Sequence, residues 1–185
     1  VKTVYRWEPG PAKEKTAWHR RRFRSVATQT KDRVWEYLEI ANRTKVPLTT
    51  GPVMMLKGGQ LLGQDVLRYT PPGAKTEVPV NVAANVLSSQ VRTEIGRRAK
   101  AHKIRYRWYT KVTYRVALKI VNHERKAIRV KVTKNVTGKV EQATGATWRR
   151  GGASGAINPQ SQLTYTAKIG AGKTWKADFT VSVYK

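Results

Sequence analysis

The 185-residue sequence contains no cysteine and only eleven acidic residues. Without cysteine it forms neither disulfide bridges nor cysteine-ligated metal sites, and it suits an oxidising or a reducing compartment equally. Apolar runs are only a few residues long, so no segment predicts a membrane-spanning helix. Because Val1 is not an initiator methionine, a cleaved export signal and a longer N-terminal region both stay open.

Positive charge is what the chain has in excess. Its 37 lysines and arginines give a formal net charge of +26, and self-repulsion of that size is easiest to understand if an anionic partner lies against the protein. With 39% hydrophobic residues, six tryptophans and eight tyrosines, the chain also has the apolar material for a core. This composition excludes a disordered polycation and predicts a folded basic protein.

Alternation of apolar and polar residues with a period of two predicts an all-β chain. The apolar side of one predicted strand holds Val112, Tyr114, Val116, Leu118 and Ile120, and that of a second holds Ile128, Val130 and Val132. In a third predicted strand Ile104, Tyr106 and Trp108 face inward while Arg105 and Arg107 face outward. Only residues 91–101 have the spacing of a short helix, and they are equally consistent with a linker.

An internal repeat indicates two similar halves. Leu38-Glu39-Ile40-Ala41-Asn42 recurs eighty positions later as Leu118-Lys119-Ile120-Val121-Asn122, and each half closes with a glycine turn and an alternating strand. We therefore expect two tandem immunoglobulin-like β-sandwich modules. The expected division is a basic N-terminal strand and arm over residues 1–30, a first module over 31–96, a basic linker over 97–103 and a second module over 104–185.

The strand and turn residues of both halves also resemble those of a known family. The likeness rests on Asn42, Leu48, Gly51-Pro52-Val53 and Pro72-Gly73 in the first half, and on Tyr114 to Asn122, Leu163-Thr164-Tyr165 and Gly170-Ala171-Gly172 in the second. In this order, over about residues 33–185, the chain resembles the C-terminal β-rich domain of the mucoidy-inhibitor-like family, whose function is unknown. The resemblance implies a β-sandwich fold and supplies no catalytic residues.

No pattern in the sequence predicts an enzyme, a cofactor or a metal site. Residues 167–174 satisfy a loose phosphate-loop pattern, but a strand-like run follows them instead of a helix, so we expect a hairpin turn there. Residues 152–156 lack the last glycine of a nucleophile elbow. The three histidines lie far apart, and the acidic residues are scattered singly, which predicts surface roles for them.

Two segments interleave cations with aromatic residues, a mixture that suits phosphate, sulfate or carboxylate groups on a polymer with rings to stack against. The predicted anion-binding residues of these segments and of the outward strand faces are Arg20, Arg21, Arg22, Arg24, Arg97, Arg98, Lys100, Lys103, Arg105, Arg107, Arg115, Lys119, Arg129 and Lys131. The predicted stacking residues are Trp18, Phe23 and Tyr109. Some of the outward cations are expected to oppose each other across adjacent strands, and a bound anion would reduce the repulsion between them.

These features favour a non-enzymatic cell-surface or assembly protein whose basic sheet faces bind acidic polysaccharide, an acidic protein surface or an anionic envelope. The alternative is a nucleic-acid-binding protein without base readout. The favoured function implies an extracellular or cell-envelope location, and Asn42 and Asn135 match the glycosylation acceptor pattern. The run from Thr3 to Trp7 predicts a strand that either pairs with a neighbouring copy, giving a homo-oligomer, or completes its own sheet.

Overall fold

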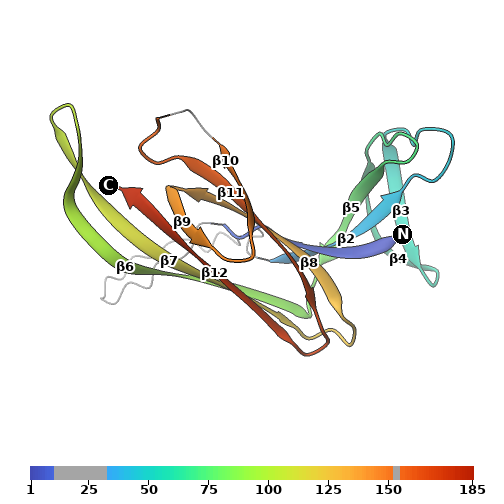
Figure 1. Ribbon diagram of the computed structural model, residues 1–185. Coiled ribbons are helices and arrows are strands. Elements are labelled where there is room, and N and C mark those ends of the chain that lie inside the picture. Colours follow the sequence, from blue (N-terminus) through green and yellow to red (C-terminus); the bar gives the residue numbers. More distant parts are fainter. Residues whose placement is uncertain (11–32, 152–154) are drawn as a thin grey trace, which may run out of the picture.

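The computed structural model describes residues 1–10, 33–151 and 155–185 (Figure 1). These residues form strands and no helix, so the predicted all-β class is confirmed. None of them belongs to a helix that is long and apolar enough to cross a membrane. In chain order the strands are β1 (Lys2–Trp7), β2 (Val34–Ala41), β3 (Gly51–Lys57), β4 (Gln60–Leu67), β5 (Lys75–Val82), β6 (Val86–Ile104), β7 (Arg107–Asn122), β8 (Ile128–Thr137), β9 (Lys139–Ala143), β10 (Thr147–Gly151), β11 (Gln160–Ile169) and β12 (Thr174–Tyr184).

The described strands are arranged in three sheets. A six-stranded sheet has the order β10-β11-β8-β1-β2-β5, a four-stranded sheet has the order β6-β7-β12-β9, and β3 pairs with β4 alone. The pairing of β1 with β8 is parallel, over Tyr5 to Trp7 and Val130 to Val132, whereas the other neighbours are antiparallel. Residues from both larger sheets share one apolar core, which gives a sandwich-like architecture.

The core contains the apolar faces that the alternation predicted. Val112, Leu118 and Ile120 of β7 are at most 1% exposed, and Val130 and Val132 of β8 are fully buried. Lysine and arginine are the commonest outward residues of the same strands, as expected for a sheet with one wet face.

The predicted linker is instead part of a long strand. Residues 97–103 lie within β6, which runs from Val86 to Ile104 and pairs with β7, so neither a linker nor the helix considered for residues 91–101 is present. The predicted inward face of Ile104, Tyr106 and Trp108 is also wrong, since these side chains are 39%, 97% and 50% exposed. The alternation is real, but none of the sheets formed by the described residues covers this end of the hairpin, so neither face is buried there.

The N-terminal strand completes the chain's own sheet. β1 lies between β2 and β8 in the middle of the six-stranded sheet, which thereby joins strands from both halves of the sequence. Both edges of β1 carry hydrogen-bonded strands from Tyr5 to Trp7, so this part of the strand completes its own sheet, whereas Lys2 to Val4 are paired on the β2 side alone.

The two repeated asparagines make matching contacts. Asn42 and Asn122 are 2% and 0% exposed, at the ends of β2 and β7. Each Nδ2 donates to the backbone oxygen four residues ahead, Val46 at 2.9 Å and Lys126 at 3.0 Å, and also to a distant backbone oxygen. Each Oδ1 accepts the N–H two residues ahead. The two asparagines of the sequence repeat thus make equivalent hydrogen bonds that hold the turns after β2 and β7.

One buried cation breaks the alternation. Lys134 occupies an inward position of β8 and is 5% exposed. Its Nζ donates to the backbone oxygens of Pro9 (3.1 Å) and Gly10 and to Oε1 of Gln90 (3.0 Å). Backbone oxygens satisfy a buried ammonium group, so Lys134 fastens the end of β1 to β6 and β8.

Candidate anion-binding site

The basic stretch predicted at residues 97–109 forms the outer part of the β6–β7 hairpin, which projects from the sandwich (Figure 1). We call residues 95–109 the basic hairpin. They contain six cations and no carboxylate, namely Arg97, Arg98, Lys100, Lys103, Arg105 and Arg107. The structure therefore brings together six of the predicted anion-binding residues and the predicted stacking residue Tyr109.

The tip of the basic hairpin is a two-residue turn. Ile104 pairs with Arg107, so Arg105 and Tyr106 form the loop, and Arg105 has a positive φ of 52°. Lys100, with a φ of 49°, lies where the pairing shifts register between Arg98 and His102. Such a bulge twists the strand and re-aims its side chains.

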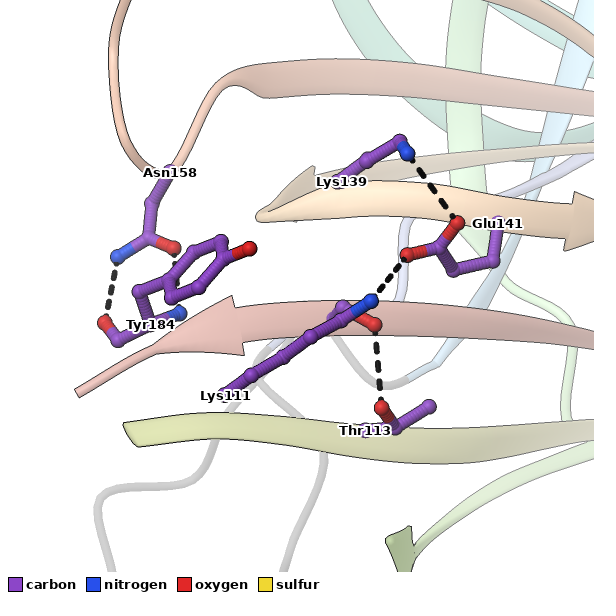
Figure 2. Close-up of polar contacts among 7 residues, drawn as sticks. Lys111, Thr113, Lys139, Glu141, Asn158 and Tyr184 are labelled. Atoms are coloured by element: carbon purple, nitrogen blue, oxygen red, sulfur yellow. Dashed lines mark hydrogen bonds and ion pairs between the residues drawn. The ribbon is translucent and has the colours of Figure 1, made fainter. Parts of the chain in front are cut away.

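The base of the basic hairpin is braced by polar contacts (Figure 2). Asn158 donates from Nδ2 to the backbone oxygen of Tyr184 and accepts its N–H at Oδ1, both at 2.8 Å. The backbone of Lys185, the next residue, exchanges two 2.9 Å hydrogen bonds with Thr110 of β7. The end of β12 thereby holds β7 at the point where the hairpin leaves the core. The base of the basic hairpin is therefore fixed relative to the sandwich.

Carboxylates neutralise cations at the base but hardly at the tip. Glu141 accepts from Lys111 at 3.0 Å and lies 3.5 Å from Lys139 (Figure 2). Within the basic hairpin, Arg97 donates two hydrogen bonds of 2.8 and 2.9 Å to Glu94, which precedes the hairpin on β6. The hydrogen bond from Arg97 lowers the pKa of Glu94, so this carboxylate stays ionised in mildly acidic solution.

Aromatic rings lie among the cations of the hairpin. The Nζ of Lys103 is 5.5 Å from the ring centre of Trp108, and the Cζ of Arg107 is 5.5 Å from that of Tyr109. Cations near aromatic faces gain a modest attraction, and the exposed rings offer flat surfaces to sugars or bases. This arrangement can contact a polymer through charge and stacking together.

The remaining predicted cations of the described strands are divided between two faces. Arg115 and Lys119 point outward from β7 in the four-stranded sheet, whereas Arg129 and Lys131 point outward from β8 in the six-stranded sheet. The cross-strand repulsion expected among these four is therefore not formed, because β7 and β8 belong to different sheets. Like charges do oppose each other in other pairs: Lys119 with Lys176, Arg129 with Lys168 and Arg6 with Lys131.

The predicted N-terminal cluster of Arg20, Arg21, Arg22, Arg24, Trp18 and Phe23 lies outside the described residues. Of the two glycosylation candidates, Asn135 is exposed on β8 and accepts from Nε2 of Gln162 at 3.1 Å. Asn42 is not available to a glycan in the folded protein, because it is 2% exposed and its Nδ2 donates to two backbone oxygens.

Sequence reasoning missed two groups of residues. Lys2, Lys126 and Lys168 line a hollow with Arg129, and Trp148 and Arg150 line another, of about 430 Å³, with Lys139 of β9. The first group could not be found from the sequence, because only strand pairing brings its residues together. The second could have been found, because the run Trp148-Arg149-Arg150 has the same mixture of aromatic ring and cation as the hairpin.

The glycine-rich stretch at 170–173 is the predicted hairpin turn between β11 and β12, with Gly172 at a φ of 66°. In the parts of the chain that the structure describes, no group of three or more histidine, aspartate or glutamate side chains is arranged to hold a metal ion. Comparison with protein-family models, curated proteins and solved structures gave no match for this chain. The resemblance to the mucoidy-inhibitor-like family thus stays a prediction.

Proposed function

We propose that this is a non-enzymatic binding protein that docks through its basic surfaces onto an acidic polysaccharide or an acidic partner surface. The observation that carries the proposal is the basic hairpin, which has six cations on fifteen residues and rings exposed at its tip, and whose one ion pair within the described part of the chain joins Arg97 to Glu94. A partner of this kind fits the outside of a cell or its envelope, where acidic glycans are common.

Charge at the hairpin favours an external anion over internal pairing. Ion pairs between described residues involve Arg6, Lys75, Arg97, Lys111, Arg115 and Lys139, and of these only Arg97 belongs to the basic hairpin. Exposed cations that repel one another lose that repulsion when a polyanion displaces their small counterions. Binding is therefore expected to weaken steeply as salt is added.

Nucleic acid is the second candidate, and the exposed rings at the tip are the observation that supports it. Tyr106 is 97% exposed and Trp108 is 50% exposed, beside Lys103, Arg105 and Arg107. Stacking of a base on an aromatic ring contributes about 1–3 kcal/mol and tolerates any sequence. The same rings also stack on the apolar faces of sugars, so exposure alone does not select between the two polymers.

Competition between polymers separates the two functions. A fluorescent heparin oligosaccharide bound at low salt is displaced with unlabelled heparin, unsulfated acidic glycan or single-stranded DNA of equal charge. The glycan function predicts that an acidic glycan displaces the probe at the lowest concentration, and the alternative predicts that DNA does. Absence of binding to all three polymers at low salt would remove both candidates.

We also propose that the fold is two tandem immunoglobulin-like modules that share the six-stranded sheet. Support comes from the matched pairings, in which β2 lies between β1 and β5 as β7 lies between β6 and β12, and from the equivalent clamps made by Asn42 and Asn122. Separate unfolding transitions that respond to Asn42→Ala and Asn122→Ala individually would support two modules. A single transition that both variants shift alike would favour one cooperative unit.

A further inference from the structure

A second basic site lies where β1 and β8 diverge. The two strands pair only from Tyr5 to Trp7, and on the N-terminal side of this contact they leave a hollow of about 360 Å³. The first residues of β1, from Lys2 to Val4, therefore have a strand paired on their β2 side alone. Figure 1 places this end of β1 on the opposite side of the molecule from the basic hairpin.

Among the described residues that line the hollow, four are cations and none is a carboxylate; the cations are Lys2, Lys126, Arg129 and Lys168. Arg129 and Lys168 are direct cross-strand partners on β8 and β11, an arrangement that destabilises a sheet by tenths of a kcal/mol to about 1 kcal/mol. Within the described residues no ion pair joins any of the four to a carboxylate.

One candidate partner, Glu39 on the neighbouring strand β2, is already engaged. Glu39 lies opposite Lys2 in the β1–β2 pairing, and its Oε1 accepts from Lys75 of β5 at 3.0 Å. Lys2 therefore shares that carboxylate. Glu36 and Glu124 raise the pKa of Tyr5, which also lines the hollow, but among the described residues neither forms an ion pair with the four cations.

The scaffold that holds the cations is fixed by a buried side chain. Asn122 is fully buried, and its Nδ2 donates to the backbone oxygens of Lys126 (3.0 Å), Ile169 (3.1 Å) and Gly170 (2.9 Å). It thus ties the β7–β8 turn, which carries Lys126, to the end of β11, which carries Lys168. The relative positions of these two backbone sites are set before any ligand arrives, which lowers the entropy lost on binding.

We propose that this hollow binds a sulfate ester carried on a sugar ring, which deepens the proposed function by naming the acidic glycan as a sulfated one. A volume of about 360 Å³ lies at the small end of ligand sites, enough for one sugar unit. The three terminal oxygens of a sulfate ester contact several converging cations at once, and the forked guanidinium of Arg129 binds two of them. A planar carboxylate offers only two oxygens to the same four cations.

The test compares two double variants that each remove one directly opposed like-charge pair. Arg129→Gln with Lys168→Gln removes the pair at the hollow, and Lys119→Gln with Lys176→Gln removes the matched exposed pair on the outer face of the other sheet. Both lose two charges, so any general effect of net charge is equal. Affinity is measured for heparin, hyaluronan and single-stranded DNA oligomers of equal charge at one salt concentration.

The hollow variant is expected to lose about tenfold more affinity for heparin than the matched variant, since two charge-assisted contacts are removed. For hyaluronan the two variants should lose equal affinity. Equal losses for heparin in both variants would overturn the sulfate site while leaving polyanion binding intact, and a selective loss for DNA would assign the hollow to phosphate instead. If the parent protein binds none of the polymers, the proposed function itself fails.

Correct folding is checked by circular dichroism and thermal unfolding of each variant. Should the double variant at the hollow not fold, Lys168→Gln alone replaces it, with Lys176→Gln as its control, because both side chains are exposed. A selective heparin loss of severalfold is then the expected result, and equal losses in the two single variants overturn the proposal.

Discussion

Replacing Asn122 with alanine should lower the stability of the protein by about 3 kcal/mol. The side chain is fully buried, its Nδ2 donates to three backbone oxygens at 2.9–3.1 Å, and its Oδ1 accepts the N–H of Glu124 at 2.9 Å. An amide has two N–H donors, so the alanine variant loses about three hydrogen bonds' worth of interaction, each with a net value near 1 kcal/mol. The carbonyl of Ile169 loses a buried donor, which adds to the loss, whereas that of Gly170 still accepts the N–H of Lys173.

Thermal unfolding followed by circular dichroism measures this effect. For a chain of this size about 1 kcal/mol corresponds to roughly 2–4 °C, so Asn122→Ala should unfold roughly 6–12 °C below the parent protein. Asn135→Ala is the matched control, because Asn135 is exposed and makes one hydrogen bond with Gln162. Its stability should stay within about 0.5 kcal/mol of the parent.

Asn122→Asp tests the reasoning more sharply than alanine does. Aspartate keeps the shape and the acceptor for the Glu124 N–H but replaces the amide donor with an oxygen that faces the carbonyls of Lys126, Ile169 and Gly170. The aspartate variant should be at least as unstable as the alanine variant at pH 7. Parent-like stability of either variant would refute the claim that this amide clamps the two turns.

Two further sets of variants test the packing of the core. A Cβ on Gly138, which has a φ of 122°, would lie 2.6 Å from the backbone oxygen of Ser182, so Gly138→Ala should lower the free energy of unfolding in urea by about 3 kcal/mol. Gly145→Ala is the control and should cost about 1 kcal/mol, because its positive φ strains the backbone but no atom lies near the added Cβ. Equal costs for the two variants would contradict the predicted clash. Burial raises the pKa of Tyr5 and of Tyr165 from 10.0 to about 12, so stability should be intact below pH 10 and fall as the pH rises from 10 to 12. Tyr165→Phe should make that fall shallower without destabilising the protein at pH 7, since the hydroxyl has no hydrogen-bond partner among the described residues, and an unchanged alkaline profile would count against this assignment.

The strands and their inward faces could be predicted from local sequence because a period of two is fixed by backbone geometry. The run from Val112 to Ile120 is an example, since each alternate residue is buried as expected. The repeat of Asn42 at Asn122 also predicted an equivalence that the hydrogen bonds confirm. The inward faces depend on residues that are neighbours in the chain, whereas the two asparagines also donate to the distant backbone oxygens of Thr70 and Ile169.

Features that depend on how the sheets pack against each other could not be predicted from the local sequence. The same alternation continues through Ile104, Tyr106 and Trp108, yet these residues are exposed because no sheet in the part of the chain that the structure describes covers the hairpin. Likewise, the parallel contact between β1 and β8 and the hollow beside it arise from segments more than 120 residues apart. Alternation assigns a side chain to a face of its strand, but only tertiary packing decides what that face meets.

The salt dependence of polyanion binding tests the central claim most directly. The slope of log K against log salt is measured with a sulfated glycan for the parent, for a hairpin variant (Lys103→Gln, Arg105→Asn, Arg107→Gln) and for a control (Arg43→Gln, Lys45→Gln, Lys57→Gln). Asparagine suits the positive φ of position 105, and the replaced control cations are exposed far along the chain from the hairpin. On single-stranded nucleic acid each cation contact contributes about 0.7 to the magnitude of this slope. By analogy, the loss of the three hairpin cations should make the slope of the hairpin variant shallower by roughly two, while the slope of the control stays close to that of the parent. Equal slopes for the hairpin variant and the control would contradict the claim that the projecting hairpin binds the polyanion.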